Sequence, residues 1–459
     1  MLRNLIGNRA FYKRVMALAL PVMIQNGITN FVNMLDNVMV GRTGTLEMTG
    51  VTIANQLIFV FNLCIFGAVS GAGIFGAQFA GNGDQKGLTY TLRFKLLSCS
   101  LLAAVCIGVF LLWGEPLIGL YLQGEGSAAD AAASLGFAKQ YLTIMLIGLI
   151  PYTIAQCYAS TLRETGQTSP PMVAGVVAVL VNLALNAVLI FGYLGAPRLG
   201  VVGAAIATVT SRFVELAIVA IWTHTHREKN GFAADLYRSL YIPRRLIGQI
   251  TLKGLPLMLN ETLWSMGMAT LSQQYSLRGQ AVVAANNICQ TFFNVFSVAF
   301  MAIGVVVGIM VGQQLGAGDT EGAKDTARKL IVFSVIVGLV VGAAYAVCAG
   351  FIPQLYNTTD NIRHIATELM LVCAAAMPVE AFAHATYFTI RSGGKAFITF
   401  VFDSGFMWGI CVPVAFLLVR YTALPVLWVY AAVQGINFIK CFIGGYLVKQ
   451  GGWVKTIVE

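Results

Sequence analysis

Charged side chains are scarce in this sequence. Lysine, arginine, aspartate and glutamate together make up 10% of the 459 residues, and the mean hydropathy is +0.77. Soluble domains carry roughly a quarter charged residues, so the composition excludes an ordinary water-soluble protein. Apolar runs recur along the whole chain, each close to or above the ~20 residues that a helix needs to cross a bilayer. We therefore predict an all-α membrane protein.

Several motifs that would indicate other functions are missing or out of place. A nucleotide-binding GxxxxGK[ST] loop is absent, which excludes intrinsic ATP hydrolysis as a power source, and no HExxH motif suggests a metalloenzyme. The nine cysteines occur singly, without a CxxC pair, so they read as packing residues. The GxGxxG match at residues 71–76 lies in an apolar run with no preceding strand, which excludes a dinucleotide fold. No cofactor is expected.

The charge that is present is mostly basic. There are 29 lysines and arginines against 19 acids, a net charge of +10. Many basic residues fall in connections on one predicted side, around residues 86–95, 163, 324–329 and 391–395 and in the segment 224–245. Cytoplasmic loops are enriched in lysine and arginine, so this placement predicts cytoplasmic termini rather than nucleic-acid binding. No cleaved signal peptide is expected.

Hydropathy and helix-breaking residues predict twelve transmembrane helices. The predicted spans are 15–40, 50–80, 90–113, 134–162, 170–192, 200–222, 246–276, 284–313, 325–350, 363–390, 397–419 and 424–448.

The two halves of the chain resemble each other. Shifted by 235 positions, from 78 to 313, the motif Gln78, Gly81, Gly83, Asp84, Gly87 matches Gln313, Gly316, Gly318, Asp319, Gly322. Each half holds six spans, an even number, so both halves enter from the same side and are related by a pseudo-two-fold axis along the membrane normal. We predict two six-helix lobes, residues 1–223 and 246–459, joined by a cytoplasmic linker at 224–245. This architecture favours transport, although channels and membrane enzymes can also be duplicated.

Two stretches carry a family resemblance. Leu20-Pro21, followed by Asp36 and Met39-Val40-Gly41, together with residues 182–208, resembles the multidrug and toxic compound extrusion (MATE) family. The resemblance implies a V-shaped pair of lobes in the inner membrane of a prokaryote. It also implies export of small organic, often cationic compounds against an inward flow of sodium ions or protons. Some relatives carry a second aspartate where Asn186 stands, so the coupling ion stays open. We expect the protein to work as a monomer in the lipid bilayer.

Asp36 is the strongest single candidate for a functional residue. An ionised aspartate at mid-membrane costs roughly 2.5–3.5 kcal/mol, so it requires a partner, a cavity or a proton. Asn182 and Asn186 share one helix face, and Thr208 follows in the next span. The resemblance implies that these four residues form an ion-coupling site. Their oxygen atoms suit Na⁺ or, after protonation of Asp36, hydrogen bonds. The alternatives are that Asp36 caps its helix near the interface and that the asparagines only join helices.

Polar and aromatic stripes on other spans predict a substrate cleft. Glu380 and His384 are four residues apart and are expected to interact, either as a proton relay or as a structural ion pair. Glu261 beside Trp264 suits lipophilic cations, unless the tryptophan faces lipid or the core. The remaining candidates, which helix contacts explain almost as well, are Asn33, Asn55, Phe59, Asn62, Asn287 and Asn294.

Other classes of membrane protein agree less well with the sequence. A flippase for lipid-linked sugars would need a cationic cleft for pyrophosphate, whereas the predicted intramembrane groups are Asp36, Glu261 and Glu380, with few lysines or arginines. A membrane enzyme would need a clustered catalytic set, which the sequence lacks. A channel or receptor stays open. The leading hypothesis is a non-enzymatic, ion-coupled multidrug exporter.

Overall fold

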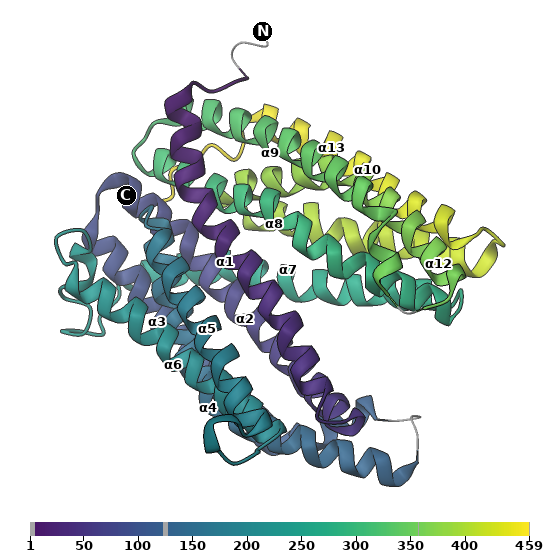
Figure 1. Ribbon diagram of the computed structural model, residues 1–459. Coiled ribbons are helices and arrows are strands. Elements are labelled where there is room, and N and C mark those ends of the chain that lie inside the picture. Colours follow the sequence, from purple (N-terminus) through teal and green to yellow (C-terminus); the bar gives the residue numbers. More distant parts are fainter. Residues whose placement is uncertain (1–4, 123–126, 357, 459) are drawn as a thin grey trace. The chain divides into compact units, whose positions relative to one another are not determined.

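Helices account for the regular structure of every range that the computed structural model describes, residues 5–122, 127–356 and 358–458 (Figure 1). The long helices are α1 (Arg9–Gly41), α2 (Thr45–Asn82), α3 (Gln85–Tyr121), α4 (Ala128–Glu164), α5 (Ser169–Phe191), α6 (Val201–Thr225), α7 (Arg244–Ser276), α8 (Gln280–Gly316), α9 (Thr320–Ala349), α10 (Asp360–Ser392) and α13 (Val426–Gln450). A further span joins α11 (Ala396–Phe400), the π-helical segments η5 (Val401–Gly405) and η6 (Met407–Cys411), and α12 (Val412–Tyr421). Short 3-10 turns are η2 (Tyr193–Gly195), η3 (Gly231–Ala233) and η4 (Ile352–Leu355).

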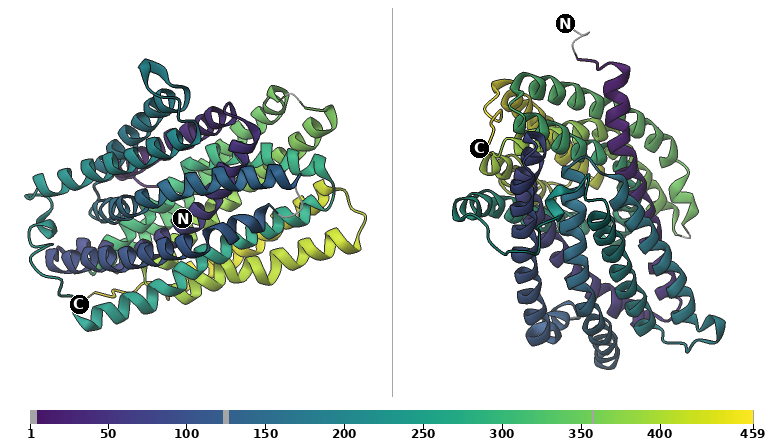
Figure 2. Two further views of the ribbon diagram at one scale, coloured as in Figure 1. Left: turned by 90° about the horizontal axis from the view of Figure 1, so that it is seen from below. Right: turned by 90° about the vertical axis from the view of Figure 1, so that its left-hand side faces the viewer.

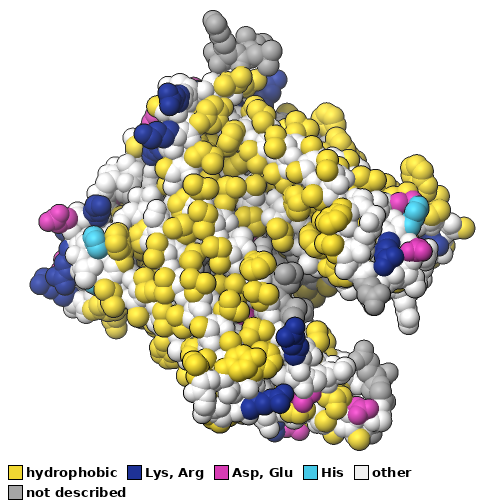
Figure 3. Space-filling model, viewed as in Figure 1, with side chains coloured by type: hydrophobic (Ala, Val, Ile, Leu, Met, Phe, Trp, Pro, Cys, Tyr) yellow, Lys and Arg dark blue, Asp and Glu magenta, His cyan; other side chains and the backbone are white. Residues whose placement is uncertain are grey.

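Each predicted span either lies within its helix or extends past the end of that helix by at most two residues. Among the described residues, eleven spans are long and apolar enough to cross a membrane. The seventh span, α7, has the length but is more polar, with Asn260 and Glu261 near its middle. Large apolar side chains such as Leu112 and Phe442 are turned outward, and hydrophobic side chains dominate the visible face in Figure 3. Such a surface suits lipid rather than water.

The chain forms two compact units. The C-terminal unit comprises Met1–Met23, Ala77–Asp84 and Leu252–Glu459, and the N-terminal unit comprises Ile24–Gly76 and Gln85–Thr251. The start of α1 and the end of α2 therefore pack with the C-terminal helices, as shown by Val15 and Leu18 in one core with Val306 and Met310 of α8. The division at the linker 224–245, which follows the sequence repeat, stays a prediction.

Three equivalent helices pack in a similar way in both units. In the N-terminal unit, α4 lies against α3 and α6, and in the C-terminal unit α10 lies against α9 and α13 (Figures 1 and 2). In the repeat, the third, fourth and sixth spans correspond to the ninth, tenth and twelfth. Both central helices contain a proline, Pro151 in α4 and Pro378 in α10, which removes a backbone hydrogen bond. The shared pattern supports a common six-helix plan.

The end of α2 crosses the end of α8 at two glycines that the repeat makes equivalent. A Cβ atom on Gly81 would collide with the backbone of Gln313, and one on Gly316 would collide with the backbone of Gln78. Each glycine therefore contacts the glutamine that lies three residues before the other glycine. Only a residue without a side chain permits this approach. Both glycines of this crossing lie within the C-terminal unit.

Two basic residues that the sequence placed in a connection are buried instead. Lys95 lies inside α3, fully buried, with its Nζ 2.6 and 2.7 Å from the carboxylate oxygens of Glu164 on α4. Arg93, also buried, donates to the backbone carbonyls of Leu236 and Tyr241 at 2.9 and 3.1 Å. Lys95 therefore binds α4 to α3, and Arg93 binds the segment after α6 to α3, whereas the sequence prediction had placed both side chains in a connection.

The crossing predicts a position-specific effect of alanine. Gly81→Ala should lower stability by about 1–3 kcal/mol, because the methyl group must displace the backbone of α8. Gly108→Ala, in α3 with open space around it, should cost nothing, since alanine is favoured over glycine in helices by about 1 kcal/mol. Thermal denaturation of the purified variants in detergent measures the difference. Equal midpoints for the two variants would contradict this packing.

Candidate functional site

Asp36 lies on α1, five residues before the helix ends at Gly41, with its carboxylate turned toward α5. Asn186 of α5 donates its amide hydrogen to Asp36 Oδ1 at 2.8 Å. The aspartate is only partly exposed, and Asn186 is buried. The contact of Asp36 is thus with a side chain of another helix, so helix capping does not account for this carboxylate.

Asn182 and Thr208 complete the same cluster. With its amide nitrogen toward Asp36, Asn182 donates to the two carboxylate oxygens at 2.8 and 3.2 Å and accepts from the Thr208 hydroxyl at 3.2 Å. The opposite orientation would press the amide oxygen against the carboxylate, so the hydrogen-bond partners decide the assignment. The structure thereby brings together all four residues that the sequence proposed for ion coupling.

The local sequence explains why α5 and α6 hold these groups in reach. The chain turns sharply after α5, and Leu199 N donates to Leu189 O at 2.9 Å across the turn. At the start of α6, Gly203 lies so close to Leu189 that a Cβ atom would approach its carbonyl oxygen to 2.6 Å. The two helices therefore pack nearly in backbone contact, and their polar faces meet one to two turns further on.

The cluster has an unused acceptor. Asn186 Oδ1 is buried and has no hydrogen-bond partner among the described residues. A buried orphan acceptor costs about 1–3 kcal/mol, and in a native protein it calls for a ligand or a specific function. Amide oxygens, a carboxylate and a hydroxyl are the donor set that a small hard cation prefers. The same atoms also suit hydrogen bonding to a protonated carboxyl group.

Two more residues border this cluster. Tyr141 of α4, which the sequence did not single out, is buried and interacts with Thr208 and with Asn55 of α2. Asn55, predicted as a cleft residue, therefore lies at the edge of the Asp36 cluster. A tyrosine in an apolar helix shows no spacing signal, which is why sequence reasoning missed it.

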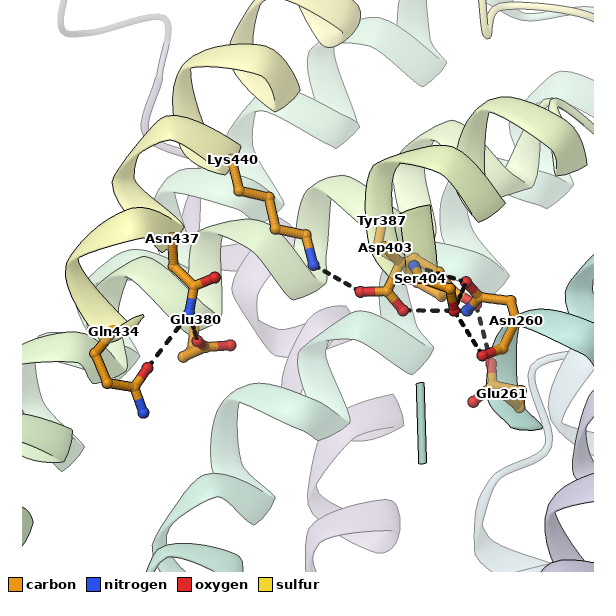
Figure 4. A network of polar contacts seen from close by, with 9 residues as sticks. All are labelled: Asn260, Glu261, Glu380, Tyr387, Asp403, Ser404, Gln434, Asn437 and Lys440. Carbon is orange, nitrogen blue, oxygen red and sulfur yellow. Dashed lines mark hydrogen bonds and ion pairs between the residues drawn. The ribbon is translucent and has the colours of Figure 1, made fainter. Parts of the chain in front are cut away.

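A second polar network occupies the C-terminal unit (Figure 4). Asn260 on α7 is fully buried and donates to Asp403 Oδ2 at 3.1 Å and to the Tyr387 hydroxyl at 3.3 Å. Tyr387 in turn donates to Glu261 Oε1 at 3.0 Å. The carbonyl oxygen of the Asn260 amide accepts from Ser404 N and Oγ at 3.2 and 2.8 Å. One asparagine thus joins three spans, with Glu261 at the edge.

Glu380 and His384 contact neighbouring helices rather than each other. Glu380 accepts from Asn437 of α13 at 2.7 Å (Figure 4). His384 interacts with the backbone of Met301 on α8 and lies beside Phe388. The interaction across one helical turn that the spacing predicted is replaced by contacts to neighbouring helices, and the relay stays a prediction.

The other predicted cleft residues are spread over four helices. Asn33 on α1, Phe59 on α2 and Asn287 and Asn294 on α8 are exposed, while Asn62 and Trp264 are half-buried. Of the predicted cleft residues, Asn55 lies at the edge of the Asp36 cluster, and Glu261 lies at the edge of the Asn260 network. The remaining residues stay predictions for cargo binding.

The sequence also missed an ion pair. Lys440 on α13 lies 2.6 Å from Asp403 Oδ1, and both side chains are at least four-fifths buried. The expectation of few buried basic residues did not identify these lysines, since Lys95 is fully buried as well. In both cases an acid neutralises the lysine. One sequence signal could have indicated the Lys440–Asp403 pair: each residue is the single charge of its predicted span, and the two charges are opposite.

Known proteins resemble this chain over nearly its whole length. The MatE family model matches residues 21–188 and 256–417, two segments that begin at the repeat-related Pro21 and Pro256. A probable multidrug resistance protein NorM from Thermotoga maritima is 25% identical, covering 97% of this chain and 94% of that protein. A probable multidrug resistance protein YoeA from Bacillus subtilis is 25% identical, covering 95% and 92%.

Solved structures agree on the fold. An outward-facing multidrug resistance MATE family transporter of the MOP superfamily superposes with a TM-score of 0.86 at 19% identity, covering 98% of this chain and 97% of that chain. The fold predicted from the sequence, twelve spans in two six-helix lobes, is confirmed.

The C-terminal network predicts a large effect of one buried substitution. Asn260→Leu should cost about 1–3 kcal/mol, because it leaves Asp403 Oδ2 and the Ser404 amide without their hydrogen-bond partner in an apolar interior. The same change at Asn287, an exposed residue of α8, should stay within about 0.5 kcal/mol. Thermal denaturation in detergent compares the two. A tolerated Asn260→Leu variant would show that the network is not structurally required.

Proposed function

The chain belongs to the MatE family of multidrug efflux transporters, and on this premise we propose that it is a secondary antiporter. It exports small organic compounds that are cationic or amphiphilic and admits Na⁺ or H⁺ in exchange, by alternating access. The ion binds at Asp36, Asn182, Asn186 and Thr208. The cargo binds along polar and aromatic residues that include Glu261 and Glu380.

One observation carries the ion site. The Asp36 carboxylate is held by neutral amides, and no lysine or arginine pairs with it in the ranges that the structure describes. A carboxylate left without a counter-charge in a membrane span is costly, so binding a cation or a proton is favourable there. The orphan Asn186 Oδ1 adds one more acceptor for that ion. By contrast, Lys95 already neutralises Glu164 in the same unit.

Coupling follows from the charge of Asp36. An ion can drive the change between outward-open and inward-open states only if it binds the two with different affinity. When Na⁺ or H⁺ neutralises Asp36, burying the α1 carboxylate against α5 no longer carries the full desolvation cost. Because the side chains of Asn182 and Asn186 carry both donors and acceptors, they can contact the carboxylate or the ion. Occupancy of this cluster thus shifts the equilibrium that releases cargo.

The choice of cationic cargo follows from the acids of the C-terminal unit. Glu261 lies on α7, where it accepts from the aromatic Tyr387 and Trp264 follows three residues later, and Glu380 lies on α10. Carboxylates with aromatic faces attract organic cations without a strict demand on shape. A lipid-linked sugar flippase is less well supported, because the buried Lys95 and Lys440 are paired with acids rather than free for pyrophosphate.

Orientation is part of the proposal: the protein lies in a prokaryotic inner membrane, with both termini and both glycine-rich turns on the cytoplasmic side. Cysteines introduced for Asp84 and Asp319 should react with an impermeant maleimide only in inside-out vesicles. Leu194→Cys, 94% exposed in the turn between α5 and α6, should react only in right-side-out vesicles. The native cysteines, all buried or half-buried, set the background. Labelling of residues 84 and 319 from opposite sides would rule out this topology.

Asp36→Asn tests the coupling site. The variant should match the wild type in expression and thermal stability, because an amide avoids the desolvation cost of the carboxylate. Efflux of a fluorescent organic cation should nevertheless fall about tenfold or more, since an asparagine cannot titrate or neutralise an ion. The measurement uses proteoliposomes with sodium and proton gradients imposed separately, which also identifies the ion.

Three further variants sharpen this test. Asn182→Ala and Thr208→Ala should weaken the apparent affinity for the coupling ion. Asp130→Asn, at an exposed acid in the first turn of α4, should behave as the wild type. Full gradient-driven efflux by Asp36→Asn would refute the assignment of the coupling site.

A further inference from the structure

Lys440 lies in a cage that is built for an ammonium group. Its Nζ is 2.6 Å from Asp403 Oδ1, 5.1 Å from the ring centre of Phe402 and 6.0 Å from that of Phe406. Both rings are more than nine-tenths buried, and the exposed fraction of the lysine side chain is 13%. A carboxylate with aromatic faces is the arrangement that proteins use to recognise ammonium ions. Here the chain supplies the occupant itself.

The backbone around the cage is unusual. Phe402 and Asp403 lie in the π-helical segment η5, and Phe406 follows it directly. π-helical turns are rare and often occur at functional sites. Adjacent residues Phe402 and Asp403 both contact the same ammonium, which links the ion pair to this local geometry.

The helix that carries Lys440 also contacts a second acid, Glu380 of α10. One turn earlier on α13, Asn437 donates to Glu380 at 2.7 Å (Figure 4). Glu380 interacts electrostatically with both Lys440 and Asp403, and Glu261 interacts with Asp403 and Arg391. The caged lysine therefore acts on the same acids to which the proposed function assigns the cargo.

The charges of this network nearly balance. The carboxylates are Glu261, Glu380 and Asp403, and the cationic side chains are Lys440 and Arg391. With ionised acids and a neutral His384, three negative charges face two positive ones. The difference is one negative charge, which a single monovalent cation cancels. Without Lys440 the difference would be two.

We propose that Lys440 is a built-in cation that determines the charge of the cargo, by leaving the acids of the C-terminal unit one negative charge to offer. The inference rests on the proposed export of organic cations and adds a specificity-determining residue to it. Lys440 occupies the Asp403 cage permanently, so an incoming monocation meets only the residual charge of Glu261 and Glu380. A dication would leave the buried network with an excess positive charge, which the low dielectric of the site penalises.

A purely structural ion pair is the competing explanation. Breaking a buried pair by removing one partner is strongly destabilising, whereas replacing both partners together is often tolerated. Stability alone therefore cannot separate the two explanations. The charge preference for bound cations can, because a structural role does not change it.

The test compares two dyes that share one ring system, ethidium with one positive charge and propidium with two. Equilibrium binding is measured by fluorescence on the purified full-length protein in detergent, without any ion gradient. Lys440→Met should raise the affinity for propidium relative to ethidium by about tenfold or more. Asp403→Asn should weaken ethidium binding by a similar factor and propidium binding more, so that the propidium-to-ethidium affinity ratio falls. The double variant Asp403→Asn/Lys440→Met, with the wild-type charge, should recover the wild-type ratio.

Lys449→Met is the matched control, since it removes one positive charge from the exposed end of the same helix. It should leave the ratio unchanged. If Lys440→Met does not fold, Asp403→Asn and the double variant still decide the question. A wild-type dye ratio in a folded Lys440→Met or Asp403→Asn variant, or an altered ratio in the double variant, would overturn the proposal. If the wild-type protein binds neither dye, the proposed function itself fails, which is a distinct result.

Discussion

The interior of a bilayer offers no water to polar side chains, and this constraint organises both units of the protein. Each charge within a span must find its partner inside the protein. Lys95 meets Glu164, and Lys440 meets Asp403 within the Phe402 and Phe406 rings. Asp36 differs from these pairs, because its partners are neutral amides. A membrane protein can keep such a carboxylate only if another species neutralises it, and this exception is what suggests a transporter.

The two units share a helix plan but not their polar chemistry. The crossing of α2 and α8 preserves the repeat down to single residues, with Gly81 and Gly316 in reciprocal contacts. Away from that crossing the units differ: one gathers a single aspartate with two asparagines, and the other brings three acids near a lysine. In the proposed function, the diverged side chains would let one unit bind the ion while the other binds the cargo.

The sequence predicted the N-terminal cluster because two local signals were joined by the family resemblance. An acid inside an apolar run stands out, and the four-residue spacing of Asn182 and Asn186 places them on one face. The same reasoning was less successful for Glu380 and His384. Their spacing is favourable, yet α13 presents the Asn437 amide to Glu380, and the backbone of α8 is available to His384. Spacing along one helix specifies which side chains share a face, but not which neighbouring helix faces them.

Hydropathy and repetition determined the spans, the duplicated plan and the family resemblance, because the ability of a segment to cross a bilayer depends on that segment alone. The network of Asn260, Asp403 and Lys440 was decided only by tertiary structure. Each of these residues lies on a different span, separated by more than 30 positions in the sequence, and no periodicity connects them. Partners across helices are selected by packing, and a buried charge acquires its role from the groups that packing brings within a few ångströms.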